Sequence, residues 1–369
     1  MNGGQKMRKW RTWLVGSVTA VLAAGSLLAG CSTSQQTEGN PPAANQGEKL
    51  DAELNVFNWT EYLPQSIIDK FEQQYGVKVN YSTYSSNEEM LAKLSVGSSG
   101  YDLSVASEYM VEMMRNLGVI QEINYENIPN FKNISADFKN LSFDPDNKFS
   151  IPYMWGDAII AVNTDKIKDK ITGYKDLWDP KYKNSMVVLD DQRAIIGITL
   201  KKMGYSLNEK DEKILQQAKD ELKKLLPNIK AFDSDSPKTM LINGEASIGF
   251  VWGAEAALAR KENPAIQYVL PEEGLYLWQD NFVIPKDAPH KKTAEAFINF
   301  LLQPEISAEI SKDFPYANPN QEALKLIDKS VTEDIAVYPP KDALQNGEHL
   351  QFLGDVTKTY DRIWSEVKQ

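Results

Sequence analysis

The sequence predicts an α/β fold, in which helices cover both faces of a parallel sheet. The chain has 369 residues, which is enough for two domains of ordinary size. Hydrophobic residues make up 42% of the chain and charged residues 25%, as is typical of a globular protein. Short apolar segments alternate with segments whose apolar residues recur at helical spacing, and this alternation of strand and helix is typical of parallel sheets.

The first strands and helices alternate directly after Glu53. The expected strands are residues 54–57, 77–81 and 102–106. The expected helices are residues 63–75, 86–94 and 110–116. Pro64 lies near the start of the first helix and Gly76 follows its end, which are common positions for these two residue types. Residues 86–89 resemble a capping box, which would open the second helix.

The same pattern continues through the rest of the chain, without an internal repeat. Further strands are expected at residues 159–162, 186–189, 246–252 and 282–285. Further helices are expected at residues 211–226, 254–261 and 294–302. The helix at residues 211–226 is charged and amphipathic, so we expect it only to pack against the sheet.

The counts of cysteine and histidine exclude several kinds of site. Cys31 is the one cysteine, so the chain can form neither an internal disulfide nor a zinc site of clustered cysteines and histidines. The two histidines, His290 and His349, lie in polar turns, and we expect both at the surface rather than in a Ser-His-Asp centre. The sequence also contains no glycine-rich phosphate loop. We therefore expect neither a metal nor a cofactor.

The net charge bears on the kind of partner. The formal charge is −11, and this argues against nucleic acid, because binding phosphates needs a basic surface. An acidic protein favours cations instead, although most surface carboxylates only serve solubility.

Residues 1–30 resemble a bacterial lipoprotein signal peptide. Basic residues precede an apolar run at residues 13–28, and Leu28-Ala29-Gly30-Cys31 follows. The run is short for a membrane-spanning helix, which needs about 20 apolar residues. The resemblance implies that the chain is cut before Cys31 and that Cys31 is lipidated. An uncleaved N-terminal anchor is the alternative. Residues 31–50 are too polar to bury a core, so we expect a flexible tether.

Aromatic and acidic residues recur where the expected strands end. In an open α/β sheet, ligands lie beyond the carboxyl ends of the strands. Ring faces attract an organic cation and cover its methylene groups, while a carboxylate supplies the opposite charge. The pattern therefore predicts a pocket for an alkyl ammonium ion. The segments are Asn58-Trp59-Thr60-Glu61-Tyr62, Ser107-Glu108-Tyr109, Asp190-Asp191, Trp252-Gly253-Ala254-Glu255, Trp278-Gln279-Asp280 and Phe314-Pro315-Tyr316.

These residues also have a purely structural interpretation. A tryptophan after a strand commonly packs in the core. Glu61 and Glu255 could be first-turn charges at helix N-termini, and Asp191 could cap a helix around Ile195. The recurrence of acid with aromatic at separate strand ends favours the pocket, but the residues alone leave both interpretations open.

Several segments carry a resemblance to a known family. They are Asn58-Trp59-Thr60-Glu61-Tyr62, Tyr81-Ser82-Thr83-Tyr84, Ile151-Pro152-Tyr153-Met154-Trp155-Gly156, Asp176-Leu177-Trp178, Trp278-Gln279-Asp280 and Pro315-Tyr316-Ala317-Asn318-Pro319-Asn320. In these segments and in their order, the chain resembles the bacterial spermidine/putrescine-binding receptors of polyamine uptake transporters. The resemblance extends from about Leu54 to the C-terminus. The resemblance implies a two-lobed, periplasmic-binding-protein-like (type II) α/β fold, with two or three crossing strands and an interlobe cleft. The implied lobe 1 comprises residues 50–156 and 280–324, and lobe 2 comprises residues 157–279 and 325–369.

The resemblance also implies roles for matched residues. Thr60 and Glu61 would hold one terminal amine, Asp280 a central or second amine, and Asp191 would face the other end. Ser107 would add a polar contact. The side chains expected along the alkyl chain are aromatic: Trp59, Tyr62, Tyr109, Trp252, Trp278 and Tyr316.

Two departures from the family pattern bear on the ligand's length. Ala194 stands where spermidine receptors carry a glutamate, and Leu350 where they carry a glutamine. Conversely, Glu255 falls where putrescine-type receptors place an acid. We therefore expect a polyamine ligand and favour putrescine over spermidine.

The implied function is capture of a polyamine outside the cytoplasmic membrane and delivery to an ABC-type permease. The partners expected are the polyamine, the permease subunits and, through Cys31, the membrane, with the receptor a monomer. The alternatives are a receptor for another small organic cation, a sensor lipoprotein that binds a polyamine without transport, and a glycosidase with paired carboxylates.

Overall fold

The computed structural model describes residues 49–368, which form one compact unit. The expected signal peptide, Cys31 and the tether as far as Glu48 lie outside the described residues. Within residues 49–368, no helix has the length and apolar character that crossing a membrane requires.

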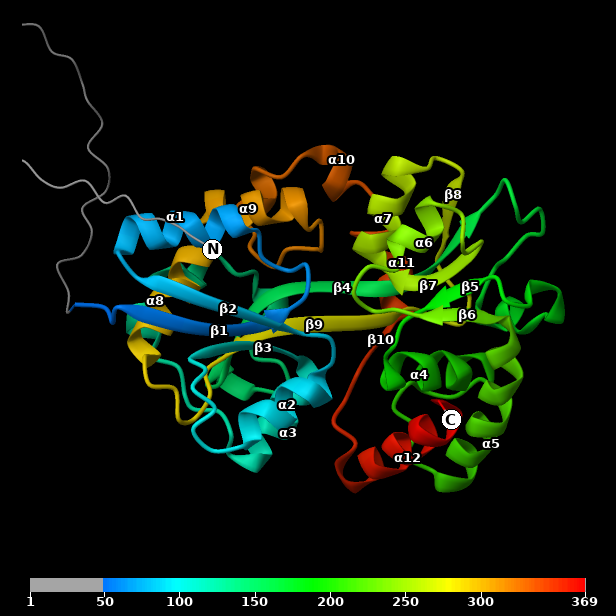
Figure 1. Ribbon diagram of the computed structural model, residues 1–369, viewed down its shortest axis with the longest axis horizontal. Helices are drawn as coiled ribbons and strands as arrows, with labels where there is room; N and C mark the ends of the chain where they lie inside the picture. The colour runs from blue at the N-terminus through cyan, green and yellow to red at the C-terminus, as the bar shows by residue number, and fades with distance from the viewer. Residues whose placement is uncertain (1–48, 369) are drawn as a thin grey trace, which may run out of the picture. The chain divides into compact units, whose positions relative to one another are not determined.

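A mixed sheet runs through the unit (Figure 1). Its strand order is β2-β1-β3-β9-β4-β7-β5-β6, while β10 pairs with β9 and β8 with β4. The strands are β1 (Glu53–Trp59), β2 (Lys78–Tyr84), β3 (Leu103–Ser107), β4 (Ser150–Asn163), β5 (Met186–Val188), β6 (Ile229–Phe232), β7 (Ile248–Trp252), β8 (Ile266–Val269), β9 (Tyr276–Val283) and β10 (Glu348–His349).

The expected parallel pairing is found within the two sides of this sheet and between β9 and β10. β1 is parallel to β2 and β3, and β5 is parallel to β6 and β7. Between these sides, β9 runs antiparallel to β3 and to β4, and β4 runs antiparallel to β7. The chain passes from one side to the other in β4 and returns in β9, so the two strands point in opposite directions.

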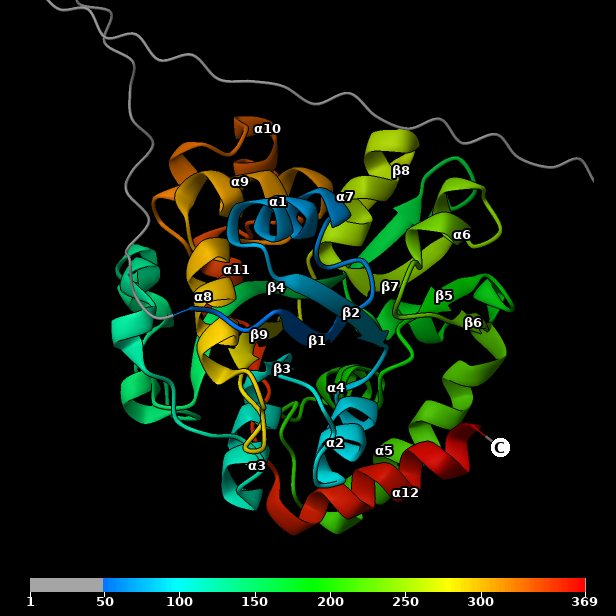
Figure 2. The ribbon, with the colours of Figure 1, turned by 60° about the vertical axis from the view of Figure 1, so that its left-hand side comes forward.

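The helices cover both faces of the sheet, as predicted. They are α1 (Gln65–Tyr75), α2 (Asn87–Ser95), α3 (Glu108–Leu117), α4 (Gln192–Lys202), α5 (Glu212–Leu225), α6 (Lys238–Ile242), α7 (Gly253–Glu262), α8 (Lys291–Leu301), α9 (Pro304–Asp313), α10 (Lys329–Thr332), α11 (Lys341–Gln345) and α12 (Thr357–Lys368). Figures 1 and 2 show α1 and α9 above the side that contains β1, and α2 and α3 below it. On the side that contains β5, α6 and α7 lie above the sheet, and α4, α5 and α12 lie below it.

The helix boundaries follow from local hydrogen bonds. Gly76 ends α1 in the left-handed conformation, with φ of 68°, and its N–H donates to the carbonyl of Glu72. Ser86 caps α2, because its hydroxyl accepts from the N–H of Glu89 at 3.2 Å. The Glu89 carboxylate returns to the N–H of Ser85 at 3.1 Å, rather than to that of Ser86, so the expected capping box is shifted by one residue.

The last predicted strand was placed too late in the chain. Residues 282–285 overlap only the end of β9, and Trp278 to Asp280 lie within this strand instead of beyond it. Every residue of β9 is buried, because both faces of the sheet are covered there. A strand buried on both faces has no alternation of polar and apolar residues to reveal its limits.

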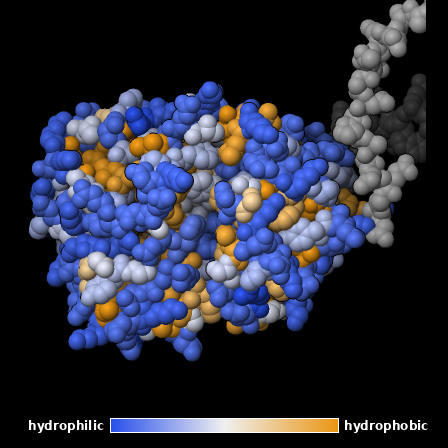
Figure 3. All heavy atoms as spheres, turned by 180° about the vertical axis from the view of Figure 1, so that it is seen from behind, coloured by the Kyte–Doolittle hydropathy of each residue, from blue (hydrophilic) through white to orange (hydrophobic). Residues whose placement is uncertain are grey.

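The apolar residues of the unit gather in its core. A continuous core cluster contains residues from both sides of the sheet, from Leu54 to Val367. The face shown in Figure 3 is mostly hydrophilic, with small apolar patches scattered over it.

The expectation that both histidines lie at the surface is correct for His349, which is exposed, but wrong for His290. The His290 ring is only 20% exposed, and its Nδ1 lies 3.1 Å from the buried carboxylate of Asp102.

The substitution Gly253→Ala should destabilise the fold. A Cβ on Gly253 would lie 1.9 Å from the carbonyl oxygen of Ala336 and 2.2 Å from Oδ1 of Asp157, so the start of α7 would have to move away from the C-terminal segment. Such overpacking costs about 1–3 kcal/mol or more. Gly97→Ala is the matched control, because a Cβ there meets no atom within 4 Å. Urea unfolding of both variants checks the prediction, and equal stabilities would contradict it.

Candidate functional site

A cavity that is open towards solvent lies where the two sides of the sheet meet, beside β9. The predicted site residues that line it are Trp59, Thr60, Tyr62, Ser107, Asp191, Trp252, Trp278, Asp280 and Tyr316. Lining residues that the sequence analysis missed are Ser85, Asn87, Ser234, Asp235 and Tyr276. The predicted residues Glu61, Tyr109 and Glu255 are not among the lining residues.

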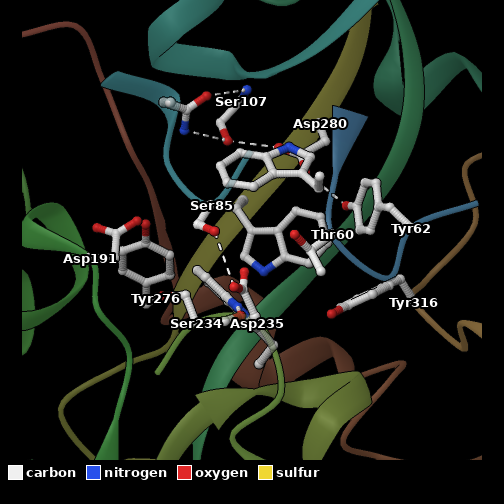
Figure 4. Close-up of a pocket in the computed structure, with 14 residues that line it drawn as sticks. Thr60, Tyr62, Ser85, Ser107, Asp191, Ser234, Asp235, Tyr276, Asp280 and Tyr316 are labelled. Carbon is white, nitrogen blue, oxygen red and sulfur yellow. Dashed lines mark hydrogen bonds between the residues drawn. The ribbon is translucent and has the colours of Figure 1, made fainter. Parts of the chain in front are cut away.

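Asp280 provides a buried carboxylate in the floor of the cavity. It belongs to β9 and is only 5% exposed. The Tyr62 hydroxyl donates to its Oδ2 at 2.7 Å and the Ser107 hydroxyl to its Oδ1 at 2.7 Å (Figure 4). Ser107 is itself held by Asn87, whose Nδ2 donates to the serine oxygen at 3.1 Å. Both carboxylate oxygens therefore have a fixed direction.

The electrostatic environment of Asp280 favours a cation. Burial raises the pKa of the Asp280 carboxyl to about 7, although the hydrogen bonds from Ser107 and Tyr62 oppose the rise. These hydroxyls orient the carboxylate but bring no positive charge. A cation that reached the two oxygens would offset the cost of burying their charge.

Aromatic rings form a connected wall beside this carboxylate. The Trp278 ring lies 6.0 Å from Trp252 at an interplanar angle of 76°, and 5.5 Å from Tyr316 at 73°. Tyr62 continues the wall, with its ring 5.1 Å from that of Tyr316. The indole N–H of Trp252 donates to the carbonyl of Ser234 at 3.1 Å, so its orientation is fixed by the backbone. The wall can cover methylene groups and attract a cation to its ring faces.

Gly156 allows Trp278 to lie close to the neighbouring strand. The two residues are paired across β4 and β9. A Cβ on Gly156 would approach Cζ2 of Trp278 to 2.8 Å, so a larger residue would push the indole away. The glycine in the segment Ile151 to Gly156 thus has a steric role in the wall.

Asp191 combines the two interpretations that the sequence left open. Its side chain caps α4, since Oδ1 accepts from the N–H of Ala194 at 2.9 Å. The same residue lines the cavity, beside Tyr276 (Figure 4). Burial raises the pKa of Asp191, and the hydrogen bond from Ala194 opposes this. Figure 4 shows Asp191 and Asp280 on different sides of the cavity.

Glu61 and Glu255 are held by a lysine that the sequence analysis did not consider. Nζ of Lys238 lies 2.6 Å from Oε2 of Glu61 and 2.9 Å from Oε1 of Glu255. Glu255 lies in the first turn of α7, as the structural interpretation expected. Glu61 lies in the turn after β1, outside any helix, so its interpretation as a first-turn charge is wrong. No feature of the sequence pairs Lys238 with either acid, because the three residues come from separate segments.

Tyr109 belongs to the protein interior. It is 3% exposed, and its hydroxyl donates to Oε1 of Glu88 at 3.2 Å. The Arg193 guanidinium lies over its ring at 5.0 Å. Tyr109 therefore packs in the interior, although it follows the end of β3, and it does not line the cavity.

The missed residues divide into two kinds. Ser234 and Asp235 follow β6, so the rule that ligands lie beyond strand ends could have found them. Tyr276 begins β9 and carries no such signal. Ser85 follows β2, and its hydroxyl donates to Oδ2 of Asp235 at 3.0 Å, which connects the two sides of the sheet across the cavity.

Among the described residues, no group of three or more acids, histidines or cysteines is arranged to hold a metal ion.

The fold and this cavity between two sheet halves define a solute-binding protein of the periplasmic type. A family model described as bacterial extracellular solute-binding protein matches residues 66–339. The chain belongs to this family, which is extracytoplasmic and non-enzymatic, so the glycosidase alternative is set aside.

Individual relatives narrow the comparison. The spermidine/putrescine-binding periplasmic proteins of Salmonella typhimurium and Escherichia coli are each 39% identical, over 98% of this chain and 99% of theirs. The putrescine/agmatine-binding protein of Pseudomonas aeruginosa is 32% identical, over 88% of this chain and 94% of its own. The structure of a putative spermidine/putrescine ABC transporter protein from Listeria monocytogenes is 36% identical, with a TM-score of 0.84, and covers 86% of this chain and 99% of that one. The predicted periplasmic-binding-protein-like fold is thereby confirmed.

Asp280→Asn should stabilise the protein, and most strongly at high pH. The folded-state pKa of about 7 exceeds the ordinary value of 3.8, so the folded protein holds the proton more tightly than the unfolded chain. Its free energy of unfolding therefore falls as pH rises from about 4 to 7. The amide avoids this loss, and the variant should exceed the wild type by on the order of 4 kcal/mol at pH 8 and by less at pH 5. Urea unfolding at both pH values measures the difference. A difference that is independent of pH would contradict the prediction.

Proposed function

We propose that this protein binds a polyamine outside the cytoplasmic membrane and delivers it to an ABC-type permease for uptake. The observation that carries the proposal is the buried Asp280 carboxylate, which hydroxyl groups orient beside the wall formed by Tyr62, Tyr316, Trp278 and Trp252. A carboxylate offsets an ammonium charge, and ring faces cover the methylenes between two such charges. The spermidine/putrescine-binding relatives support the same ligand class.

Each lining residue then has a proposed role. One ammonium group pairs with Asp280, and a second approaches Asp191, which lies on another side of the cavity. The role of Ser107 is to orient the Asp280 carboxylate, to which its hydroxyl donates. The remaining predicted residues, Trp59, Thr60, Tyr62, Trp252, Trp278 and Tyr316, enclose the alkyl chain.

We propose further that the unit has two lobes, residues 50–156 with 280–324 and residues 157–279 with 325–369, which close over the ligand. Two observations support these limits. The boundaries at residues 156 and 280 fall within β4 and β9, the strands that cross between the sides. α12 packs against α4 and α5, which agrees with assigning the C-terminal segment to lobe 2. Gln192 of α4 donates to Oε1 of Glu88 of α2 at 3.2 Å, a contact between the two proposed lobes that would hold them together. Binding would then shift the lobes towards the closed form that a permease recognises.

Asp280→Asn should weaken polyamine binding about 100-fold or more, because it removes the charge that an ammonium group needs in a buried place. Isothermal titration with putrescine and with spermidine measures the effect. Asp211→Asn is the matched control, since Asp211 only caps α5 at an exposed position. Similar losses in both variants would refute the assigned site.

The pH dependence of ligand affinity is a second test of the role of Asp280. The pKa of Asp280 is about 7, whereas alkyl ammonium groups stay charged well above this pH. Affinity for the wild type should therefore fall as pH is lowered from 8 to 6, and Asp280→Asn should lack this dependence. A wild-type affinity that rises over this interval would count against the role of Asp280.

We also propose that the mature chain begins at Cys31 and is anchored through a lipid on its thiol. The sequence Leu28-Ala29-Gly30-Cys31 supports this, and a structurally similar protein from Treponema pallidum, 31% identical with a TM-score of 0.75, is described as a lipoprotein. Intact mass spectrometry of protein extracted from membranes should find a diacylglycerol adduct on Cys31 and no residues before it. Cys31→Ser should lose the adduct, and a mature chain with a different first residue would refute the proposal.

A further inference from the structure

Lys238 provides an ammonium group of the protein itself beside the cavity. It is the first residue of α6, and its Nζ contacts Glu61 at 2.6 Å and both carboxylate oxygens of Glu255 at 2.9 and 3.1 Å. Ser236 adds a fourth contact at 3.2 Å. Two carboxylates and a hydroxyl around one primary ammonium is the arrangement that the end of a polyamine would require.

Two of the three side chains in this charged group are largely withdrawn from solvent. The side chain of Glu255 is 4% exposed and that of Lys238 is 18% exposed, while Glu61 is 42% exposed. Burial alone would lower the pKa of Lys238, but the charges of Glu255 and Glu61 reverse this and raise it. Lys238 is therefore an ammonium ion throughout the physiological pH range, and it occupies both acids.

This group lies against the Tyr316 end of the cavity. Thr60 lines the cavity, and the next residue, Glu61, turns towards Lys238. The turn places Glu61 in the left-handed region, with φ of 51°, which non-glycine residues avoid because it is strained. Tyr316 lines the cavity as well, and after burial the carboxylates of Glu255, Asp280 and Glu61 each raise its pKa, so all three acids lie near its hydroxyl.

The charges restrict where the ammonium groups of a ligand can pair. Asp280, Asp191 and Asp235 line the cavity and accept hydrogen bonds from hydroxyl and backbone groups, so a ligand cation could pair with each of them. Glu61 and Glu255 are already paired. An ammonium group directed between Glu61 and Glu255 would meet the like charge of Lys238, which already holds both acids, and like charges at close range repel.

We propose that Lys238 is a specificity-determining residue, whose ammonium group takes the place of a ligand ammonium between Glu61 and Glu255 and so favours a diamine over a triamine. The inference rests on the proposed function as a polyamine receptor. It changes the expectation drawn from the sequence, in which Glu61 and Glu255 themselves would hold the ligand.

Lys238→Met tests this, because methionine keeps an unbranched side chain and removes the charge. Isothermal titration with putrescine and spermidine gives the ratio of the two dissociation constants. In the wild type, putrescine should bind more tightly, and in Lys238→Met the ratio should move towards spermidine by at least tenfold, since the freed carboxylates can hold the third ammonium group. Lys238→Arg keeps the charge and should retain the preference for putrescine.

Lys70→Met is the matched control for the loss of one positive charge. Lys70 forms an ion pair with Glu309 on the surface of the same protein, and neither residue lines the cavity. Its ratio of dissociation constants should equal that of the wild type. Thermal unfolding of every variant shows whether it is folded, and Lys238→Gln replaces Lys238→Met should the latter fail to fold.

The outcomes separate the inference from the function on which it rests. If the wild type binds neither amine, the proposed function is wrong and the inference falls with it. If the wild type binds either amine but Lys238→Met changes both affinities by the same factor, Lys238 only joins the two sides of the cavity, and the assignment of specificity is overturned. A wild type that prefers spermidine would also overturn it.

Discussion

The buried carboxylate of Asp280 is the constraint on which the rest of the site depends. It lies within a strand whose two faces are both covered, and the groups that hold it are hydroxyls. A negative charge in such a place is unfavourable until a proton or a cation offsets it. Tyr62 and Ser107 fix the direction from which a cation can approach, and the Trp278 and Trp252 rings determine that the cation should carry an apolar body. The charge on this carboxylate therefore lowers the stability of the free protein but raises its affinity for a cationic ligand.

Much of this arrangement could be predicted from the sequence, because strand ends are visible there. Trp59, Thr60, Ser107 and Asp191 follow or end strands with clear boundaries, and the structure brings them to one cavity. The alternation of strands and helices likewise predicted the parallel pairing found within each side of the sheet. The cation pocket itself needed the repeated pairing of acids with aromatic residues, since each residue alone also suits a cap or a core.

The rest depends on contacts that a linear pattern does not contain. β4 and β9 are buried on both faces, so their limits and antiparallel direction were hidden, although Asp280 and Trp278 lie on β9. Tyr109 follows β3, but its ring packs inward beneath Arg193, because burying an aromatic ring is energetically favourable. Glu61 and Glu255 carry the expected charge, but both form ion pairs with Lys238. Composition counts acids, whereas only a structure shows which of them are already paired.

The position of β9 bears on the order of events during capture. Asp280 and Trp278 belong to a strand that joins the two sides, so the proposed closure about β4 and β9 would leave them almost stationary. Asp191 and Asp235 lie away from these strands and would move further. A ligand would then meet the floor of the cavity before the outer acids close on it. In that case the floor would govern the association rate and the outer acids the dissociation rate.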